Sequence, residues 1–299
     1  MKYLFLINPA AGKNSPALRL KEEIEAECHR RNLDYECRIT EKAGHARELT
    51  RQFENCGHLR VYGVGGDGTL NEIASAAAGA ENVEIGLFSC GSGNDYIRTF
   101  GGGAAFLNVP KQLDAKSHRV DMIQSSTGEM ALNICSLGLD AKVAYEMVQF
   151  KKLPMIGGSL AYQLALAKTF LEKLGTELQV VIDGEKKYTG RYLFVLAGCG
   201  RYYGGGFCGA PDADPGDGLL DFVLVKVPKL YRIPGLVGIY KRGEHLRNEK
   251  FQDILEFTRG TRIEIKSTSP AVVNFDGECL VTREIHAEIV PGAVRFLVP

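Results

Sequence analysis

Short apolar runs alternate with amphipathic segments through about the first 120 residues. Runs with the length and composition of buried strands are Lys2–Ile7, Asp34–Ile39, Leu59–Val64 and Val83–Phe88. Between them, Pro16–Arg31 and Ala43–Phe53 place apolar residues at helical spacing, opposite a charged face. Strands that alternate with helices predict a parallel sheet, and ligands bind such sheets at the carboxyl ends of the strands.

Beyond about Asp121 the pattern changes to short alternating runs, which are typical of antiparallel strands. These runs are Ala131–Cys135, Glu177–Ile182, Tyr192–Ala197, Leu219–Val225, Arg262–Lys266, Ala271–Phe275 and His286–Ile289. Helical patterns interrupt them at 159–174 and 231–240. We therefore expect an α/β N-terminal domain with a parallel sheet over 1–122 and a β-rich domain, an antiparallel sandwich or barrel, over 123–285. Residues 286–299 can pack back onto the first domain.

The composition is that of an ordinary soluble enzyme. A chain of 299 residues exceeds what one core usually fills, so we expect two domains. Lys plus Arg equals Asp plus Glu, 36 each, so no global field attracts nucleic acid. The eight cysteines show no C-x-x-C pair and no zinc spacing, which predicts reduced thiols in a cytoplasmic protein. The opening apolar run stops at Asn8-Pro9, too early for a signal peptide, and no run reaches the roughly 18 apolar residues of a membrane span.

The most informative motif is a glycine run that contains one acid: Gly63, Gly65, Gly66, Asp67 and Gly68. It follows a predicted strand and precedes a predicted helix over 69–78. Glycines expose backbone N–H groups, and the helix N-terminus adds positive partial charge, so the loop favours phosphate oxygens. A carboxylate at an anion site repels a polyphosphate unless a divalent cation lies between them. The loop therefore predicts a magnesium nucleotide and makes the first domain the nucleotide-binding one.

Other nucleotide sites fit the sequence less well. The spacing Gly63-x-Gly65-x-x-Gly68 also satisfies the dinucleotide fingerprint, but the nearest acid for a ribose, Glu84, begins its strand rather than ending it. A P-loop fails because Ile7 replaces the first glycine and Asn14 the metal-binding hydroxyl. The protein-kinase H-R-D and D-F-G signatures are missing. A glycine-rich turn with Asp67 as a helix N-cap is the simple structural alternative.

Several loops together resemble a known family. In chain order they are Asn8–Lys13, Gly65–Glu72, Cys90–Arg98, Val120–Asp121, Asn133–Asp140, Ala210–Ala213, Asp217–Asp221 and Asp276–Glu278. The whole chain resembles the soluble diacylglycerol kinase catalytic-domain family, which includes bacterial lipid kinases and sphingosine kinases and is related to NAD kinase. One departure is Ser92, where the family usually carries threonine; serine keeps the hydroxyl.

The resemblance implies a lipid kinase that transfers the γ-phosphate of ATP to a hydroxyl of diacylglycerol or a related lipid, with Mg²⁺, in a cleft between the two domains. The nucleotide-binding residues that it implies are Asn8, Pro9, Ala10, Ala11, Gly12, Thr40, Gly65, Gly66, Asp67, Gly68, Thr69, Leu70, Asn71, Ser92 and Asn94. Asp67, Asp95 and Asp121 would support the catalytic Mg²⁺ network, and Asp217 with carbonyls near Asp214 and Leu219 a structural Mg²⁺. The catalytic residues would be Asp67 together with Asp276 or Glu278 as the base, a choice that the sequence leaves open.

Lipid access predicts a protein that is peripheral to the membrane and docks transiently. The segment 226–250 carries seven Lys or Arg against two Glu, interleaved with apolar residues, as on a helix that rests on an anionic bilayer. Residues 147–174 are a second candidate, for the acyl chains. We expect no nucleic-acid partner, and exposed edge strands allow a homodimer. Two alternative functions stay open: an NAD-kinase-like kinase of a soluble metabolite, and a non-catalytic nucleotide-binding regulator.

Overall fold

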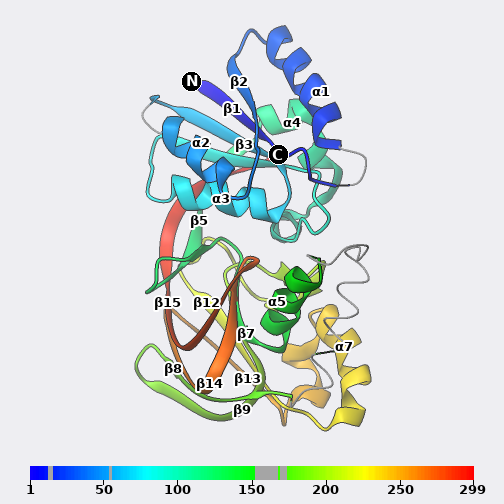
Figure 1. Cartoon of the computed structure of the whole chain (residues 1–299), viewed down its shortest axis with the longest axis vertical. Coiled ribbons are helices and arrows are strands. Elements are labelled where there is room, and N and C mark those ends of the chain that lie inside the picture. The colour runs from blue at the N-terminus through cyan, green and yellow to red at the C-terminus, as the bar shows by residue number, and fades with distance from the viewer. Residues whose placement is uncertain (13–15, 54–55, 152–167, 169–173) are drawn as a thin grey trace. The chain divides into compact units, whose positions relative to one another are not determined.

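In the computed structural model the chain forms two compact units (Figure 1). Unit 1 comprises 1–122, 215–218 and 290–299, and unit 2 comprises 123–214 and 219–289. The structure describes residues 1–12, 16–53, 56–151, 168 and 174–299. The chain re-enters unit 1 at Val290 rather than at the expected position 286. The turn Pro215–Gly218 also belongs to unit 1, which the alternating pattern around it did not indicate.

Unit 1 is built on a parallel sheet, as predicted. Its strands are β1 (Lys2–Ile7), β2 (Asp34–Ile39), β3 (Leu59–Gly65) and β4 (Val83–Ser89), in the order β2-β1-β3-β4. The last part of β15 (Glu278–Val298) pairs with β4 in parallel at Arg295 and Phe296. The helices are α1 (Pro16–Arg30), α2 (His45–Phe53), α3 (Asp67–Ala77) and α4 (Val109–Leu113), with short 3₁₀ turns η1 (Tyr96–Phe100) and η2 (Gly103–Leu107).

The core of unit 1 is aromatic at its centre. The rings of Phe5, Tyr62 and Phe88 lie on the three middle strands, with centroids 5.3–6.2 Å apart. All three side chains are fully buried, and the Tyr62 hydroxyl donates to the carbonyl of Gln112 at 2.8 Å. Because the buried hydroxyl has its partner, the ring gains apolar burial without an unsatisfied polar atom. This packing fixes the strands whose ends carry the loops described below.

Unit 2 is dominated by antiparallel pairs. Its strands are β5 (Lys116–Ser125, which begins in unit 1), β6 (Met130–Ala131), β7 (Ile134–Gly138), β8 (Thr176–Ile182), β9 (Lys186–Gly198), β10 (Tyr202–Tyr203), β11 (Phe207–Cys208), β12 (Leu220–Lys226), β13 (Leu255–Gly260) and β14 (Arg262–Phe275), together with the first part of β15. The main order is β13-β12-β9-β7-β14-β15, and β8 pairs with both β9 and β14. Since β9 and β14 each pair with both β7 and β8, the sheet closes around its own core. This confirms the predicted β-rich second domain.

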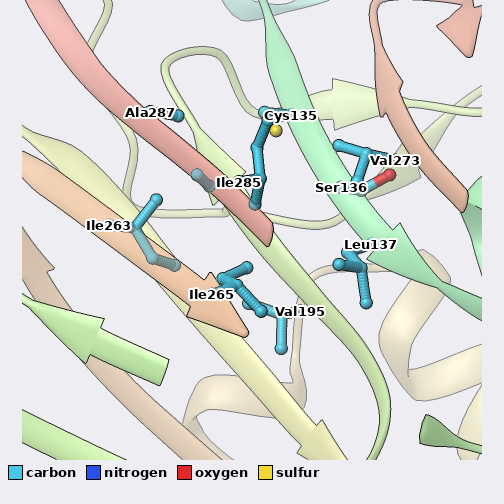
Figure 2. A pocket seen from close by; sticks show the side chains of 10 residues that line it. Cys135, Ser136, Leu137, Val195, Ile263, Ile265, Val273, Ile285 and Ala287 are labelled. Atoms are coloured by element: carbon cyan, nitrogen blue, oxygen red, sulfur yellow. The ribbon is translucent and has the colours of Figure 1, made fainter. Parts of the chain in front are cut away.

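The closed sheet of unit 2 encloses a small apolar cavity (Figure 2). Side chains of Val195 on β9, Ile265 on β14, and Ile285 and Ala287 on β15 converge on it. These residues belong to the hydrophobic core cluster of the unit. We therefore interpret the cavity as a packing defect of the core rather than as a ligand site.

The helical elements of unit 2 are α5 (Leu139–Lys151), η3 (Leu230–Arg232), α7 (Ile233–Lys241), η4 (His245–Arg247) and η5 (Glu249–Phe251). The helical pattern at 231–240 corresponds to η3 and α7, whereas the one at 159–174 lies almost wholly outside the described residues. Among the described residues, no helix has both the length and the apolar composition that a membrane span needs. The eight cysteines are all described, and all are free thiols.

His245 is the buried histidine of unit 2. Its ring is fully enclosed, lies 4.5 Å from the ring of Tyr240, and donates from Nε2 to the carbonyl of Gly209 at 3.2 Å. Burial lowers the pKa of His245 from 6.5 to about 4, and the bond to the Gly209 carbonyl opposes this shift only in part. The folded state therefore holds the neutral imidazole.

Unit 2 should lose stability in mild acid because of His245. The unfolded chain binds a proton near pH 6.5 and the folded one only near pH 4, so the stabilisation is complete above pH 6.5 and disappears as the pH falls toward 4. The loss amounts to about 3 kcal/mol. In urea unfolding at pH 7 and pH 4.5, His245→Phe should show a smaller pH dependence than the wild type, while the exposed control His118→Gln keeps it. Equal pH dependence in all three proteins would exclude His245 as the cause.

Candidate functional site

Three loops of unit 1 meet at the carboxyl edge of its sheet. We call them the β1 loop (8–12), the β3 loop (65–69) and the β4 loop (90–95). The amide of Gly91 donates to the carbonyl of Gly65 at 2.9 Å, and a Cβ atom placed on Gly91 would lie 2.5 Å from Cα of Gly66. Gly12 has φ +73°, and a Cβ there would lie 2.5 Å from the carbonyl oxygen of Cys90. Glycine is required at these positions because the backbones touch.

The Asn8 side chain of the β1 loop stabilises this arrangement. Asn8 Nδ2 donates to Thr69 Oγ1 at 3.2 Å, and Asn8 Oδ1 accepts from the amide of Ala10 at 3.0 Å. The amide of Thr40, which follows β2, donates to the carbonyl of Ile7 at 2.8 Å. The carboxyl ends of β1, β2, β3 and β4 are therefore linked by hydrogen bonds or backbone contacts within unit 1.

The β3 loop leads directly into α3. Gly66 is the N-cap and Asp67 is the first helical residue, so the helix begins two residues before the predicted Thr69 and Asp67 is not its N-cap. The amides of residues 67–69 have no acceptor within the helix, as in the first turn of any helix. They stand at the positive end of the helix dipole, where a phosphate group binds well.

Asp67 links the β3 loop to the β4 loop instead of capping the helix. Its Oδ1 accepts from the amides of Asp95 and Tyr96 at 2.8 and 3.3 Å. Burial raises the pKa of Asp67, the nearby Asp95 carboxylate raises it further, and the backbone amides oppose both effects. The loops thus concentrate negative charge in a partly dehydrated place.

The carboxylates of Asp67 and Asp95 flank Gly93. A Cβ atom placed on Gly93 would lie 2.8 Å from Asp67 Oδ2 and 3.6 Å from Asp95 Oδ2, whereas Oδ1 of Asp95 pairs with Arg98 at 3.2 Å. Two hard oxygens beside a position without a side chain fit a hard divalent cation. Over the described ranges, however, no three His, Cys, Asp or Glu side chains lie close enough to hold a metal ion by themselves.

Asp121 holds the backbone of unit 1 together. Its Oδ2 accepts from the amide of Gly218 at 2.8 Å and its Oδ1 from the amide of Gly292 at 2.7 Å. Its own amide donates to the carbonyl of Pro215 at 2.6 Å. Asp121 therefore ties β5 to the turn 215–218 and to the start of the returning part of β15. Within unit 1 its contacts fit a positioning role better than that of a direct metal ligand.

The residues expected at the structural metal are divided between the units. Asp217 lies exposed in the turn that belongs to unit 1, while Asp214 and Leu219, on either side of this turn in the chain, belong to unit 2. The turn itself is anchored by Asp121 through Gly218. The structural metal site therefore stays a prediction.

In unit 2, Asp276 and Glu278 have different surroundings. Asp276 has φ +47°, and its carboxylate accepts three backbone amides: Oδ2 from Leu132 and Asn133 at 2.7 and 2.8 Å, and Oδ1 from Ile134 at 2.8 Å. Glu278, at the first position of β15, has an exposed side chain. Asp276 fixes the segment that enters β7, whereas Glu278 extends into solvent.

A third acid of unit 2 received no role from the sequence. Burial raises the pKa of Asp140, at the start of α5, while the Ala141 amide and the hydroxyls of Ser136 and Tyr203 oppose the shift. The pKa of the Cys135 thiol is raised by burial, then by Asp276 and then by Asp140, so both acids lie near this thiol. An isolated acid in the apolar run Leu137-Gly138-Leu139-Asp140-Ala141 was the available sequence signal.

Other residues of these motifs stabilise the loops and nearby helices through hydrogen bonds and burial. Asn94, with φ +51°, donates from Nδ2 to the carbonyls of Ser89 and Gly91 at 3.0 and 2.9 Å and so shapes the β4 loop. Leu70 is buried and its amide donates to Gly66, and Asn71 is also buried, while Ser92 is exposed at the loop tip. Glu72, to which no role was assigned from the sequence, accepts from the amides of Gly44 and Ala46 at 2.8 and 3.0 Å and caps α2.

A methyl group should disrupt the contact between the β3 and β4 loops. Gly91→Ala places a carbon 2.5 Å from Gly66 Cα, so we expect a loss of about 1–3 kcal/mol in unfolding free energy. Gly68→Ala is the matched control, because a Cβ there meets no atom within 4 Å. Urea unfolding of both variants checks this. An unfolding free energy for Gly91→Ala equal to that of Gly68→Ala would contradict the backbone contact.

Comparison with known proteins covers the whole chain. The family model of the diacylglycerol kinase catalytic domain matches residues 2–125, and that of the YegS C-terminal NAD kinase beta sandwich-like domain matches residues 133–298. A protein of Pseudomonas fluorescens named "Probable lipid kinase YegS-like" is 29% identical over 288 residues, which are 94% of this chain and 92% of the relative.

Two solved structures are similar in fold. A diacylglycerol kinase from Bacillus anthracis matches with a TM-score of 0.74 at 20% identity and covers 100% of this chain and 97% of its own. An NAD kinase from Archaeoglobus fulgidus in complex with ATP matches with a TM-score of 0.53 at 14% identity, covering 100% and 94%. At these identities the likeness concerns the fold alone. Since the two family models match consecutive parts of one chain, the chain belongs to the diacylglycerol kinase catalytic-domain family, in the group with a YegS-type C-terminal domain.

Proposed function

We propose that this protein is an ATP- and Mg²⁺-dependent lipid kinase that phosphorylates a hydroxyl of diacylglycerol or a related lipid. The observation that carries the proposal is the meeting of three loops, two of them glycine-rich, at the first turn of α3, with two carboxylates beside Gly93. Phosphoryl transfer requires alignment and neutralisation of phosphate charge more than covalent chemistry. In this proposal the backbone amides of unit 1 would align the phosphates, and a cation beside Asp67 and Asp95 would neutralise their charge.

Each loop of unit 1 would contribute a separate part of nucleotide binding. The amides of residues 67–69 would bind phosphate oxygens, and the exposed Ser92 hydroxyl could donate from the tip of the β4 loop. Asp67 and Asp95 would hold Mg²⁺, which when bound neutralises charge on the phosphate oxygens. Asn8 and Asn94 would act indirectly, because their amide groups already brace the loops.

We assign the base to Glu278 rather than to Asp276. A base must reach the hydroxyl of the acceptor, and the Glu278 side chain is exposed. The carboxylate of Asp276 accepts three backbone amides, so moving it to accept a proton would leave these buried donors without a partner. Asp276 is then a positioning residue, which holds the segment 132–134 and the turn before Glu278.

Removing the charge of Asp67 should abolish metal binding without lowering the stability of the fold. The raised pKa means that the ionised Asp67 destabilises the metal-free fold at neutral pH, so Asp67→Asn should unfold at the same temperature as the wild type or higher. Its Oδ1 can still accept the two amides. Phosphoryl transfer should fall about 100-fold or more, and the increase in Tm that Mg²⁺-ATP gives should disappear. The exposed Asp34→Asn is the control, and undiminished stabilisation of Asp67→Asn by Mg²⁺-ATP would contradict the assignment.

Two variants distinguish the base from the positioning residue. With dispersed dioctanoylglycerol as acceptor, Glu278→Gln should lower kcat about 10²- to 10⁴-fold and leave the unfolding free energy within about 0.5 kcal/mol. Asp276→Asn should lose about 1.5–3 kcal/mol, because one amide of the segment 132–134 then faces an NH₂ group. The reverse pattern would make Asp276 the base.

A further inference from the structure

The segment Lys229–Lys241, which contains η3 and α7, carries both buried and exposed apolar side chains. Its inner face carries Leu236, Ile239 and Tyr240, which are buried in a core cluster of unit 2. These three apolar residues of the segment 226–250 therefore belong to the core of unit 2, and docking can use only the exposed ones. Figure 1 shows α7 at the outside of unit 2, and its Tyr240 ring lies 5.2 Å from the ring of Phe194 on β9.

The outer face carries an apolar strip of its own. Leu230, Tyr231 and Val237 are 66%, 77% and 45% exposed, and Pro234 and Gly235 between them are exposed as well. Tyr231 and Leu230 are the two most exposed large hydrophobic side chains of the described part of the chain. The outer face of a surface helix is normally polar. Single exposed apolar residues need no explanation, but three within eight positions mark a contact surface.

Basic residues stand at both ends of the strip, and residues 227–243 contain no acid. Arg232 pairs with Asp253 at 2.6 Å and Arg242 with Glu244 at 2.7 Å. Within the described ranges Lys229 and Lys241 form no ion pair, although the Lys241 ammonium lies 5.5 Å from the Phe207 ring centroid. The surface therefore combines exposed apolar side chains with two ammonium groups that can bind anions.

We propose that Lys229–Lys241 is a docking surface for an anionic lipid bilayer. Leu230 and Val237 enter the acyl boundary, Tyr231 lies at the headgroup level, and Lys229 and Lys241 bind lipid phosphates. Tyrosine suits this level because its ring is apolar and its hydroxyl polar. A protein partner fits less well, since stable protein interfaces use some 20–30 residues a side and are poor in lysine. The inference rests on the proposed function only in that a lipid acceptor would lie in the bilayer.

Vesicle co-sedimentation of the full chain tests the proposal without any turnover. The wild type should bind vesicles of phosphatidylcholine and phosphatidylglycerol more tightly than vesicles of phosphatidylcholine alone, and salt should weaken the difference. The triple variant Leu230→Ser/Tyr231→Ser/Val237→Ser should bind about tenfold more weakly or worse. Lys229→Gln and Lys241→Gln should each reduce binding to the anionic vesicles about fivefold. The control Leu18→Ser/Leu107→Ser, which changes two exposed apolar side chains of unit 1, should bind like the wild type.

Three results would overturn the docking surface. One is a wild type that binds neither vesicle; another is a triple variant that binds as the wild type does; the third is a control that loses as much binding as the triple variant. Circular dichroism confirms that each variant is folded. Phosphorylation of dioctanoylglycerol below its micelle concentration separates this proposal from the proposed function, because the triple variant should match the wild type there. Vesicle binding without any phosphorylation by the wild type would reject the kinase and leave the docking surface standing.

Discussion

The close contact between the β3 and β4 loops is the constraint on which the candidate site depends. It consists of one hydrogen bond, from the Gly91 amide to the Gly65 carbonyl, and of backbone atoms that leave no room for a side chain. Adjacent parallel strands already place these loops side by side, and the glycines let them touch. The same contact sets the first turn of α3 beside the turn that carries Asp95. The arrangement of the β3 loop, the β4 loop and the first turn of α3 thus results from one local packing contact.

Carboxylates that accept backbone amides are the second recurring device of this chain. Asp67 and Asp121 accept two amides each in unit 1, and Asp276 accepts three in unit 2. Hydrogen bonds to a charged acceptor are strong, and they orient loops that have few apolar contacts. An acid within a family motif is therefore not automatically a ligand or a base. Before such a role is assigned, one must ask which backbone amides its carboxylate oxygens already accept.

The sequence was sufficient for the parallel sheet and for the antiparallel second unit, because hydrophobic periodicity is a local property. It also identified the loops that meet at the sheet edge, since strand ends of a parallel sheet gather there. It failed where a role depends on long-range pairing. The start of α3 at Asp67 and the capping of α2 by Glu72 follow from partners that are distant in the chain. The same reason explains why Asp276 and Glu278 could not be distinguished, and why the inner and outer faces of α7 were merged into one apolar segment.

The central claim is that this chain phosphorylates a lipid hydroxyl with ATP. The most direct measurement is transfer of labelled γ-phosphate from Mg²⁺-ATP to a panel of neutral and anionic lipids with free hydroxyls, dispersed in mixed micelles, with NAD as the soluble acceptor. We expect label in the lipid phase, dependent on Mg²⁺, and none in NAD. Label in NAD alone, or tight ATP binding without transfer to any acceptor, would contradict this claim.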